Sequence, residues 1–203
     1  IRDRPDGDVS GDSNAEYSTW GAWAMGSPDI SPNAGDQNAA VHLGFWVAGE
    51  VLDQSDIPTS GSASMTGRAV FNVAYRYNQA NSDYGVTQYS TDADVSASFN
   101  WGSGSYSGQL DFANFDSGNS IVSNAGFTSF SVSLAGTGAT YAGSLNDTNN
   151  GWTREAVIAG ALYGNNTPVE SGGRISVGLS KSGSLGTSGA NDFYMAEGIY
   201  LID

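Results

Sequence analysis

The densest run of chemically active side chains lies near the start of the chain, where acidic and small residues alternate. The oxygen-bearing residues at alternate positions there are Asp6, Asp8, Ser10 and Asp12. Carboxylate and hydroxyl oxygens in this spacing, with glycines between them, match the first half of a calcium-binding loop. The last position of such a loop holds a bidentate glutamate, but here it is Tyr17, and Glu16 comes one residue early. Two alternatives stay open, a calcium site and a flexible acidic lead over residues 1–15.

The only histidine is His42, and there is no cysteine. A serine hydrolase could use this histidine, but the chain lacks the G-x-S-x-G turn that presents the nucleophile. A zinc site needs three or four His or Cys ligands and cannot be built from one. In the alternating strand pattern around it, His42 lies on the face opposite to that of Val41 and Leu43, toward solvent or a loop.

Two pairs of carboxylates could serve as the acid and base of a glycosidase, which holds two carboxyl groups roughly 5–9 Å apart. Asp92 and Asp94 share one face at the start of a strand pattern, and Asp53 and Asp56 sit in a polar loop. On an acidic chain such pairs also arise by chance, and charges at strand ends discourage edge-to-edge pairing. A polysaccharide-active enzyme is therefore one alternative function.

Tryptophans are the remaining candidates for binding. Trp20, Trp46 and Trp101 could form a sugar-stacking platform or a protein hot spot, because aromatic side chains dominate interface energetics. In the competing interpretation Trp23 and Trp101 fill a core while Trp20 and Trp46 cap its end. The pattern favours the core for Trp23 and Trp101 and leaves Trp20 and Trp46 as candidate ligand-binding residues.

The elements that position these residues are predicted to be short strands. Apolar residues alternate with polar ones through 17–25, 41–48, 63–75 and 93–112, the last interrupted by a glycine-rich turn. About ten such segments, with turn signals every 8–12 residues, are typical of a sandwich or barrel. No segment has a convincing helical stripe. The long polar connections 26–40, 78–91 and 146–155 are predicted to be the recognition loops.

Composition limits the class of partner. The chain has 203 residues, of which 39% are hydrophobic and only 14% charged, and its net charge is -14. The negative electrostatic field of such a chain repels nucleic acid and anionic membranes, so neutral or basic partners are expected. No stretch approaches the roughly 18 apolar residues of a membrane span. A first residue that is not methionine is expected of a mature or excised fragment.

Several strand segments also carry a family resemblance. They are residues 61–67, 94–99, 106–108 and 141–145, the run Ala159–Gly164 with Glu170 and Gly172-Gly173 behind it, and the aromatic segments 17–23 and 46–49. In this order they resemble the β-barrel domain of transferrin-binding protein B, which is also found at the C-termini of FecR-type bacterial surface proteins. The chain departs from that family in lacking a lipid-anchoring cysteine and in its C-terminal motif, which is Ala196–Tyr200.

The resemblance implies an eight-stranded antiparallel barrel with a filled interior, secreted or displayed on a bacterial surface. Members of the family bind host iron proteins, haem or complement regulators. The resemblance also suggests haem ligation by His42 or by a loop tyrosine, Tyr84 or Tyr89.

The expected architecture is therefore all-β, with an acidic lead over 1–15 and a domain over 16–203. That domain is predicted to be a single up-and-down barrel of about eight strands with an additional N-terminal aromatic strand pair. The expected function is an extracellular or surface module that binds a host or environmental protein or glycan through its loops. Alternatives are a carrier of haem or a lipophilic ligand, and the enzyme described above.

Overall fold

The computed structural model describes residues 2–3, 16–26, 41–76, 87–181 and 192–203. The strands are β1 (Arg2–Asp3), β2 (Ser18–Gly26), β3 (Val41–Gly49), β4 (Gly61–Arg76), β5 (Thr87–Gly102), β6 (Ser105–Ala113), β7 (Phe130–Thr137), β8 (Thr140–Asn149), β9 (Trp152–Tyr163), β10 (Glu170–Lys181) and β11 (Asp192–Ile202). A single 3-10 turn, η1 (Gln54–Asp56), and one short helix, α1 (Ser120–Asn124), are the helical elements of this part of the chain. No helix in these ranges is long and apolar enough to cross a membrane.

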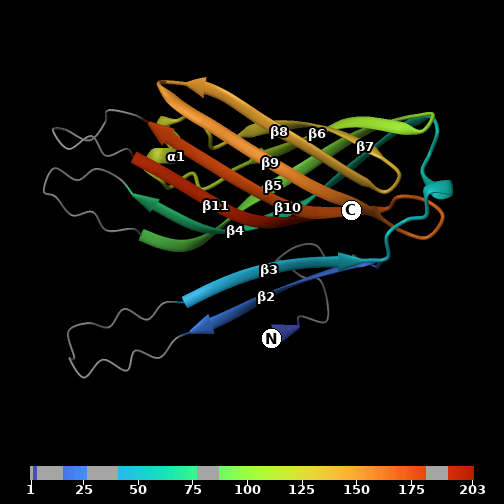
Figure 1. Ribbon diagram of the computed structural model, residues 1–203, viewed down its shortest axis with the longest axis horizontal. Helices are drawn as coiled ribbons and strands as arrows, with labels where there is room; N and C mark the ends of the chain where they lie inside the picture. Colours follow the sequence, from blue (N-terminus) through green and yellow to red (C-terminus); the bar gives the residue numbers. More distant parts are fainter. Residues whose placement is uncertain (1, 4–15, 27–40, 77–86, 182–191) are drawn as a thin grey trace, which may run out of the picture.

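Strands β4 to β11 follow one another around a closed antiparallel barrel, in which β11 pairs back to β4 (Figure 1). The predicted up-and-down barrel of eight strands is confirmed. Its connectivity follows from the two-residue alternation, because each strand needs a hydrogen-bonded neighbour on both sides and its apolar face toward a common interior. Closure also removes the unpaired edges that a flat sheet of this size would expose.

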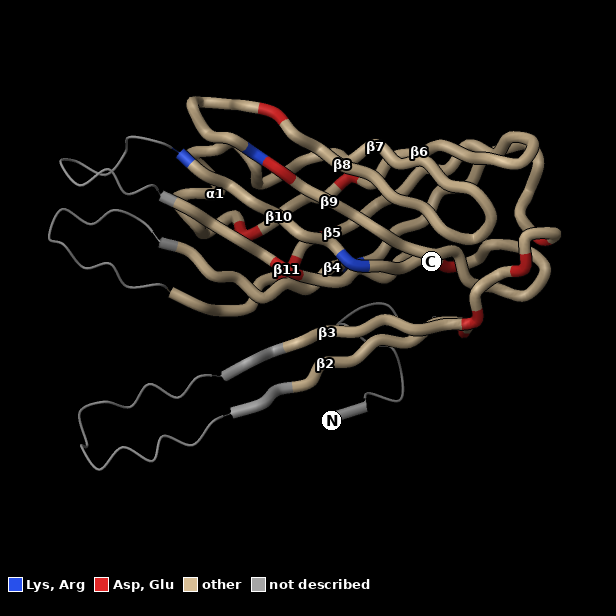
Figure 2. The backbone as a smooth tube through the Cα atoms, in the orientation of Figure 1, with Lys and Arg blue, Asp and Glu red and all other residues tan. Residues whose placement is uncertain are grey.

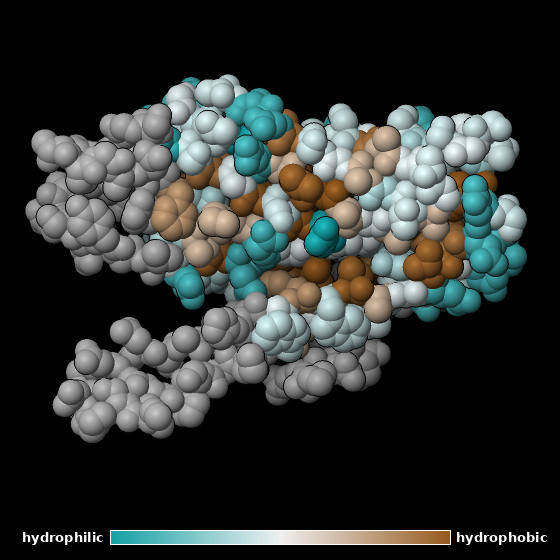
Figure 3. Space-filling model, viewed as in Figure 1, coloured by the Kyte–Doolittle hydropathy of each residue, from teal (hydrophilic) through white to brown (hydrophobic). Residues whose placement is uncertain are grey.

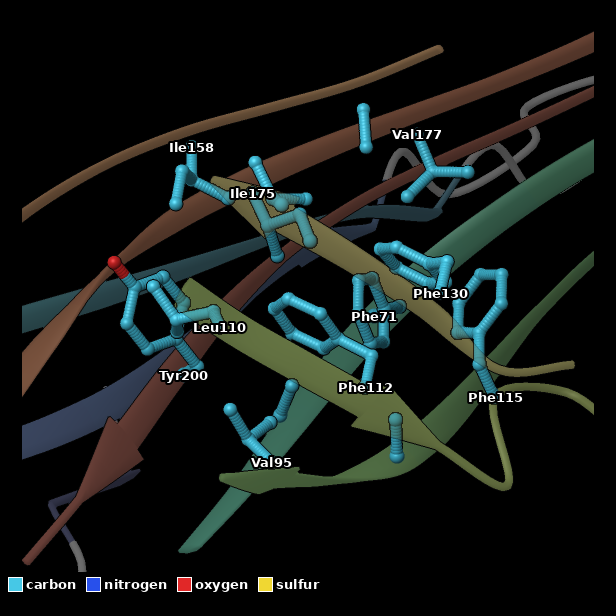
Figure 4. Packing of buried hydrophobic residues seen from close by; sticks show 14 of the residues in the cluster. Phe71, Val95, Leu110, Phe112, Phe115, Phe130, Ile158, Ile175, Val177 and Tyr200 are labelled. Atoms are coloured by element: carbon cyan, nitrogen blue, oxygen red, sulfur yellow. The ribbon is translucent and has the colours of Figure 1, made fainter. Parts of the chain in front are cut away.

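The barrel interior is filled with side chains. Every second residue of β7 is buried, and the inward residues of the other strands meet them at the centre (Figure 4). Phe112 and Phe130 stack there with their ring centroids 4.7 Å apart. Between β6 and β7, the segment that contains α1 closes one end of the barrel, where Phe115, Ile121 and Phe127 are fully buried. We call this segment the plug, because its apolar side chains are buried in that end of the core.

A separate small sheet, β1-β2-β3, lies beside the barrel wall formed by β10 and β11 (Figure 1). A Cβ atom on Gly172 of β10 would lie 3.1 Å from Val47 Cγ2, so the missing side chain makes room for Val47 of β3. The predicted N-terminal strand pair is confirmed. The short strand β1 falls within the predicted acidic lead and pairs with β2 at Ala22 and Gly21.

The predicted loop at 146–155 is wrong, because β8 and β9 continue through it as a hairpin. Their two-residue turn is Asn150-Gly151, with φ angles of 53° and 76°. Two positive φ angles are what a tight hairpin turn requires, and Asn-Gly supplies them at low cost. Arg154 donates to the carboxylate of Asp147 (Nε to Oδ1, 2.6 Å), which ties the polar strand ends together. The predicted loop 78–91 is also shorter than expected, since β5 begins at Thr87.

Candidate functional site

The small sheet carries two tryptophan rings that lie flat across the neighbouring strand. Trp23 of β2 is paired with Gly44 of β3, and Trp46 of β3 is paired with Gly21 of β2. A Cβ atom on Gly44 would lie 2.2 Å from the Trp23 ring, and one on Gly21 would lie 2.5 Å from the Trp46 ring. Each ring therefore covers the glycine opposite, which a larger residue would prevent. We call these four residues the tryptophan face.

The tryptophan face points away from the barrel. Trp46 and Val47 are consecutive in β3, so their side chains leave opposite faces of the sheet. Val47 packs toward Gly172 of the barrel wall, which leaves Trp46 and Trp23 on the outward side. Trp23 is 42% exposed. An indole of this exposure, fixed in orientation, is available for contact with another molecule.

Trp20 lies on the opposite side of the sheet from the tryptophan face. It is paired with Val47, so it faces the barrel, and its indole Nε1 is buried with no hydrogen-bond partner in the described ranges. Trp20 and Trp46, the two predicted ligand-binding tryptophans, are therefore not brought together. The core assignment of Trp23 is wrong. Alternation gives the face of a strand on which a residue lies, but not which face is covered.

A signal for the tryptophan face was nevertheless present in the sequence. Gly21-Ala22-Trp23 and Gly44-Phe45-Trp46 are two copies of G-x-W. In an antiparallel pair with these segments in register, each glycine faces the tryptophan of the other copy. The repeat could have indicated two rings lying on one face. Trp101, by contrast, is half-buried at the barrel end and stacks on Phe99 with ring centroids 5.5 Å apart.

A buried carboxylate fixes the small sheet to the barrel. Glu170, the first residue of β10, accepts hydrogen bonds from the backbone N–H groups of Glu16 and Tyr17 and from the hydroxyl of Ser18. The Tyr17 contact measures 3.0 Å (N to Oε1), and Glu170 is almost fully buried. Hydrogen bonds to an ionised acceptor are stronger than neutral ones, so this contact, here called the Glu170 clamp, holds the start of β2 firmly.

Tyr89 is positioned by the plugged end of the barrel. Its hydroxyl donates to the carboxylate of Asp116, which also accepts from Tyr194, and Asn119 Nδ2 donates to Tyr89 Oη at 2.9 Å. Burial, and then the hydrogen bond to Asp116, raise the pKa of Tyr89, so its hydroxyl stays protonated. A haem iron would need the tyrosinate form, which this environment disfavours.

The other predicted site residues are not tested. Tyr84 and the predicted calcium ligands Asp6, Asp8, Ser10 and Asp12 lie outside the described residues. His42 belongs to β3, but its side chain is likewise outside the description. In the ranges that are described, no group of three or more His, Cys, Asp or Glu side chains could hold a metal ion. The calcium site at the start of the chain stays a prediction.

The candidate catalytic carboxylates Asp92 and Asp94 lie together beside an arginine. Asp92 and Asp94 both contact the guanidinium of Arg68 on the outer wall, with Asp94 Oδ1 at 3.0 Å from Nη1. Asn114 also donates to Asp94 (Nδ2 to Oδ2, 2.6 Å). Asp53 is exposed at the start of η1. The first pair therefore shares one arginine on the outer wall, which offsets one of its two charges.

An open pocket of about 860 Å³ lies at the barrel end opposite the plug, between the tips of the β5–β6 and β7–β8 hairpins. We call it the mouth pocket. It is lined by Asn100, Trp101, Gly102, Ser105, Tyr106, Ser107, Ala135, Gly136, Thr137, Thr140, Tyr141 and Ala142. Its aromatic residues are in mutual contact, since the ring centroid of Tyr106 lies 5.0 Å from that of Trp101 and 6.5 Å from that of Tyr141. None of these lining residues is charged.

Comparison with solved structures supports the fold. The chain is similar to a crystal structure of the vaccine antigen transferrin binding protein B from Haemophilus parasuis Hp5, in a variant with one tryptophan replaced by alanine. The identity is 17% and the TM-score 0.50, over 94% of this chain and 34% of that one. A second structure of that antigen, with a tyrosine and a tryptophan replaced, gives 18% identity and a TM-score of 0.48 over 94% and 33%. No protein-family model and no curated protein matches the chain.

The chain spans about a third of the length of these two structures. At such low identity the likeness concerns the fold alone. The architecture is that of a closed, side-chain-filled barrel similar to one in transferrin binding protein B. Beside this barrel, the N-terminal sheet presents the tryptophan face.

Proposed function

We propose that the chain is a non-catalytic binding module that recognises a protein partner through the tryptophan face. The observation that carries the proposal is the pair of indole rings laid flat, one across each glycine, on the outward side of the sheet. Tryptophan is enriched among the few residues that supply most of the free energy at protein interfaces. A flat surface with small residues beside the rings suits a protein better than a small ligand, which is bound in concave sites.

The barrel makes this surface rigid. The Glu170 clamp holds one end of the small sheet, and the following chain pairs with the barrel through Leu52, whose N–H donates to Leu162 O at 3.2 Å. A preorganised surface loses little conformational entropy when a partner binds. The rings are also fixed by the glycines beneath them, so binding requires no rearrangement of side chains.

Fold likeness and charge support the class of partner. The protein of similar fold is, by its name, a transferrin-binding protein and a vaccine antigen, which favours a protein partner and a location outside the cell or on its surface. Carboxylates are scattered over the molecule while Lys and Arg are rare (Figure 2), and the net charge is -14. A partner with a neutral or basic surface is expected, because an acidic one would be repelled.

The test compares variants of the tryptophan face with a matched control. Trp23→Ser and Trp46→Ser each remove an indole from the face, while Met195→Ser removes an exposed apolar side chain from the barrel wall, where Met195 is 54% exposed. Apolar side chains are exposed at several places on the wall formed by β9, β10 and β11 (Figure 3). Met195→Ser therefore controls for the loss of an exposed apolar side chain outside the tryptophan face. Each immobilised variant is exposed to transferrin and to fractionated serum proteins, and bound proteins are quantified.

We expect at least one protein to bind the native chain and the Met195→Ser variant equally. Either tryptophan variant should weaken that binding by tenfold or more, about 1.4 kcal/mol or above, as for a hot-spot residue. Identical sets of bound proteins for all four chains would contradict the proposal. Loss of binding in the Met195→Ser variant alone would contradict the proposal and show that the interface lies on the barrel wall.

A further inference from the structure

We propose that the tryptophan face binds arginine side chains, which the partner presents at alternate positions of an extended basic segment. This inference rests on the proposed function, because it names the chemistry of the partner that the same surface recognises. Three features of the described residues support it. They are the spacing of the two indoles, a carboxylate on the same side of the sheet, and the charge of the chain segment that builds the sheet.

The two indole rings follow one another along the sheet. Trp23 is level with Gly44, and Trp46 is level with Gly21, two residues further along the strand pair. Antiparallel strands rise about 3.4 Å per residue, so the two rings are offset by about 7 Å along the strands. In any extended segment, the side chains at positions i and i+2 have this spacing and point to the same side. An extended segment laid along the sheet can therefore place one side chain on each ring.

Arginine is the side chain whose chemistry matches an exposed indole on an acidic protein. Its guanidinium group is planar and permanently charged, and it stacks on aromatic faces. The face of an indole carries negative electrostatic potential, and tryptophan is the strongest aromatic partner for a cation. Trp23 offers such a face, since it is 42% exposed and its ring covers Gly44.

A carboxylate continues the tryptophan face toward one end of the sheet. The backbone N–H of Glu50 donates to Tyr17 O at 2.8 Å, which extends the β2–β3 pairing one residue past Ser18 and Gly49. Side chains alternate between the two faces, so Glu50, four residues after Trp46, leaves the sheet on the same side as the indoles. Glu50 is exposed, and none of the described residues forms an ion pair with it. It is available to a cation of the partner.

The charge of this part of the chain favours a basic partner. Residues 1–56, which include the small sheet and the chain that leads to the barrel, contain ten Asp and Glu but only two Lys and Arg. Acidic residues lie at the end of β3 where the chain leads to the barrel (Figure 2). Arg174, an exposed cation of β10, belongs to the barrel wall behind the sheet. A negative field attracts a basic segment to the surface, where the indoles can select its guanidinium groups.

The probes are short capped peptides of threonine that carry two arginines. In the first peptide one threonine separates the arginines, in the second the arginines are adjacent, and in the third citrulline replaces both arginines of the first. Citrulline keeps the planar shape of arginine and loses its charge. Binding to the full chain is followed by indole fluorescence and by the NMR signals of the indole N–H groups. We expect the first peptide to bind best and the citrulline peptide least, and added salt should weaken binding of the first.

Four variants assign the contacts. Trp23→Ser and Trp46→Ser should each weaken binding of the first peptide about two- to fivefold, as expected for the loss of one cation–π contact at an exposed site. Glu50→Gln should weaken it about twofold, as for a surface ion pair. Glu155→Gln, which removes the same charge from an exposed position in β9, should leave it unchanged.

Equal affinities for the arginine and citrulline peptides, or for separated and adjacent arginines, would overturn the proposal. These comparisons use the native chain, so they do not depend on how the variants fold. Absence of peptide binding, while serum proteins still bind through Trp23 and Trp46, would overturn the arginine preference and leave the proposed function standing. Binding of an insoluble glucan that Trp23→Ser abolishes, without binding of either arginine peptide, would overturn both.

Discussion

At the scale of single residues, glycines decide where the large aromatic side chains of this protein lie. Within the barrel, Gly160 adjoins a buried chain of hydroxyls in which Tyr200 donates to Tyr141 at 2.8 Å (Oη to Oη). Tyr141 is in turn hydrogen-bonded to Ser171 at 2.6 Å (Oη to Oγ). The rings occupy the volume that a side chain at position 160 would need. The same principle operates outside the barrel, where Gly44 makes room for Trp23.

The Gly160→Ala variant should therefore be destabilised. Its Cβ atom would lie 2.4 Å from Tyr200 Oη and 2.6 Å from Tyr141 Cζ, so both buried rings must shift. Overpacking of this kind costs about 1–3 kcal/mol, measurable as a lower denaturant midpoint at constant slope. The matched control is Gly178→Ala in β10, where the nearest atom is 3.9 Å away. Equal midpoints for the two variants would contradict this account of Gly160.

At the scale of elements, the Glu170 clamp determines whether the small sheet and the barrel move together. Glu170→Gln replaces an ionised acceptor with an amide that can no longer accept from all three donors on residues 16–18. Bonds to a charged group contribute about 1.5–3 kcal/mol, so the sheet should open locally while the barrel persists. Amide hydrogen exchange should accelerate in β2 and β3 and stay unchanged in β4 to β11. Glu155→Gln, at an exposed position in β9, is the control. Uniformly faster exchange would mean that the clamp is part of the barrel's global stability.

The same scale shows what the sequence could and could not predict. The strands of the barrel and its closure were predictable because apolar residues alternate along each strand and tight turns follow. The β8–β9 hairpin was missed because Asn146 to Asn149 are all polar, although Asn150-Gly151 marks the turn. Helix α1 is too short to show a helical period. The mouth pocket was not predictable, since it depends on how two hairpins far apart in sequence meet in the closed barrel.

At the scale of the whole molecule, buried tyrosines predict a loss of stability at alkaline pH. Burial raises the pKa of Tyr141 to about 12, and it also raises the pKa values of Tyr106, Tyr194 and Tyr200. In the unfolded chain a tyrosine ionises near pH 10, so the stabilisation is complete below that value. Above it, stability falls by about 1.4 kcal/mol per pH unit for each such tyrosine, until the pKa of the folded state is reached.

Denaturant unfolding at several values between pH 8 and 12 measures this decline, with tyrosinate absorbance recorded in parallel. Unfolding and ionisation should coincide, and Tyr141→Phe should make the decline less steep. Ionisation of all tyrosines near pH 10 with the circular dichroism spectrum unchanged would show that the phenols are accessible in the folded protein.

The solid interior of the barrel has a consequence for any molecules that bind on its outside. The described strands form a hydrogen-bonded cylinder packed with aromatic and aliphatic side chains, and close-packed interiors of this kind have low compressibility. Molecules held on its two sides would be kept apart at a constant spacing, each retaining the affinity it has alone. Such a body acts as a stiff adaptor, in which either contact surface can change by mutation without cost to the other.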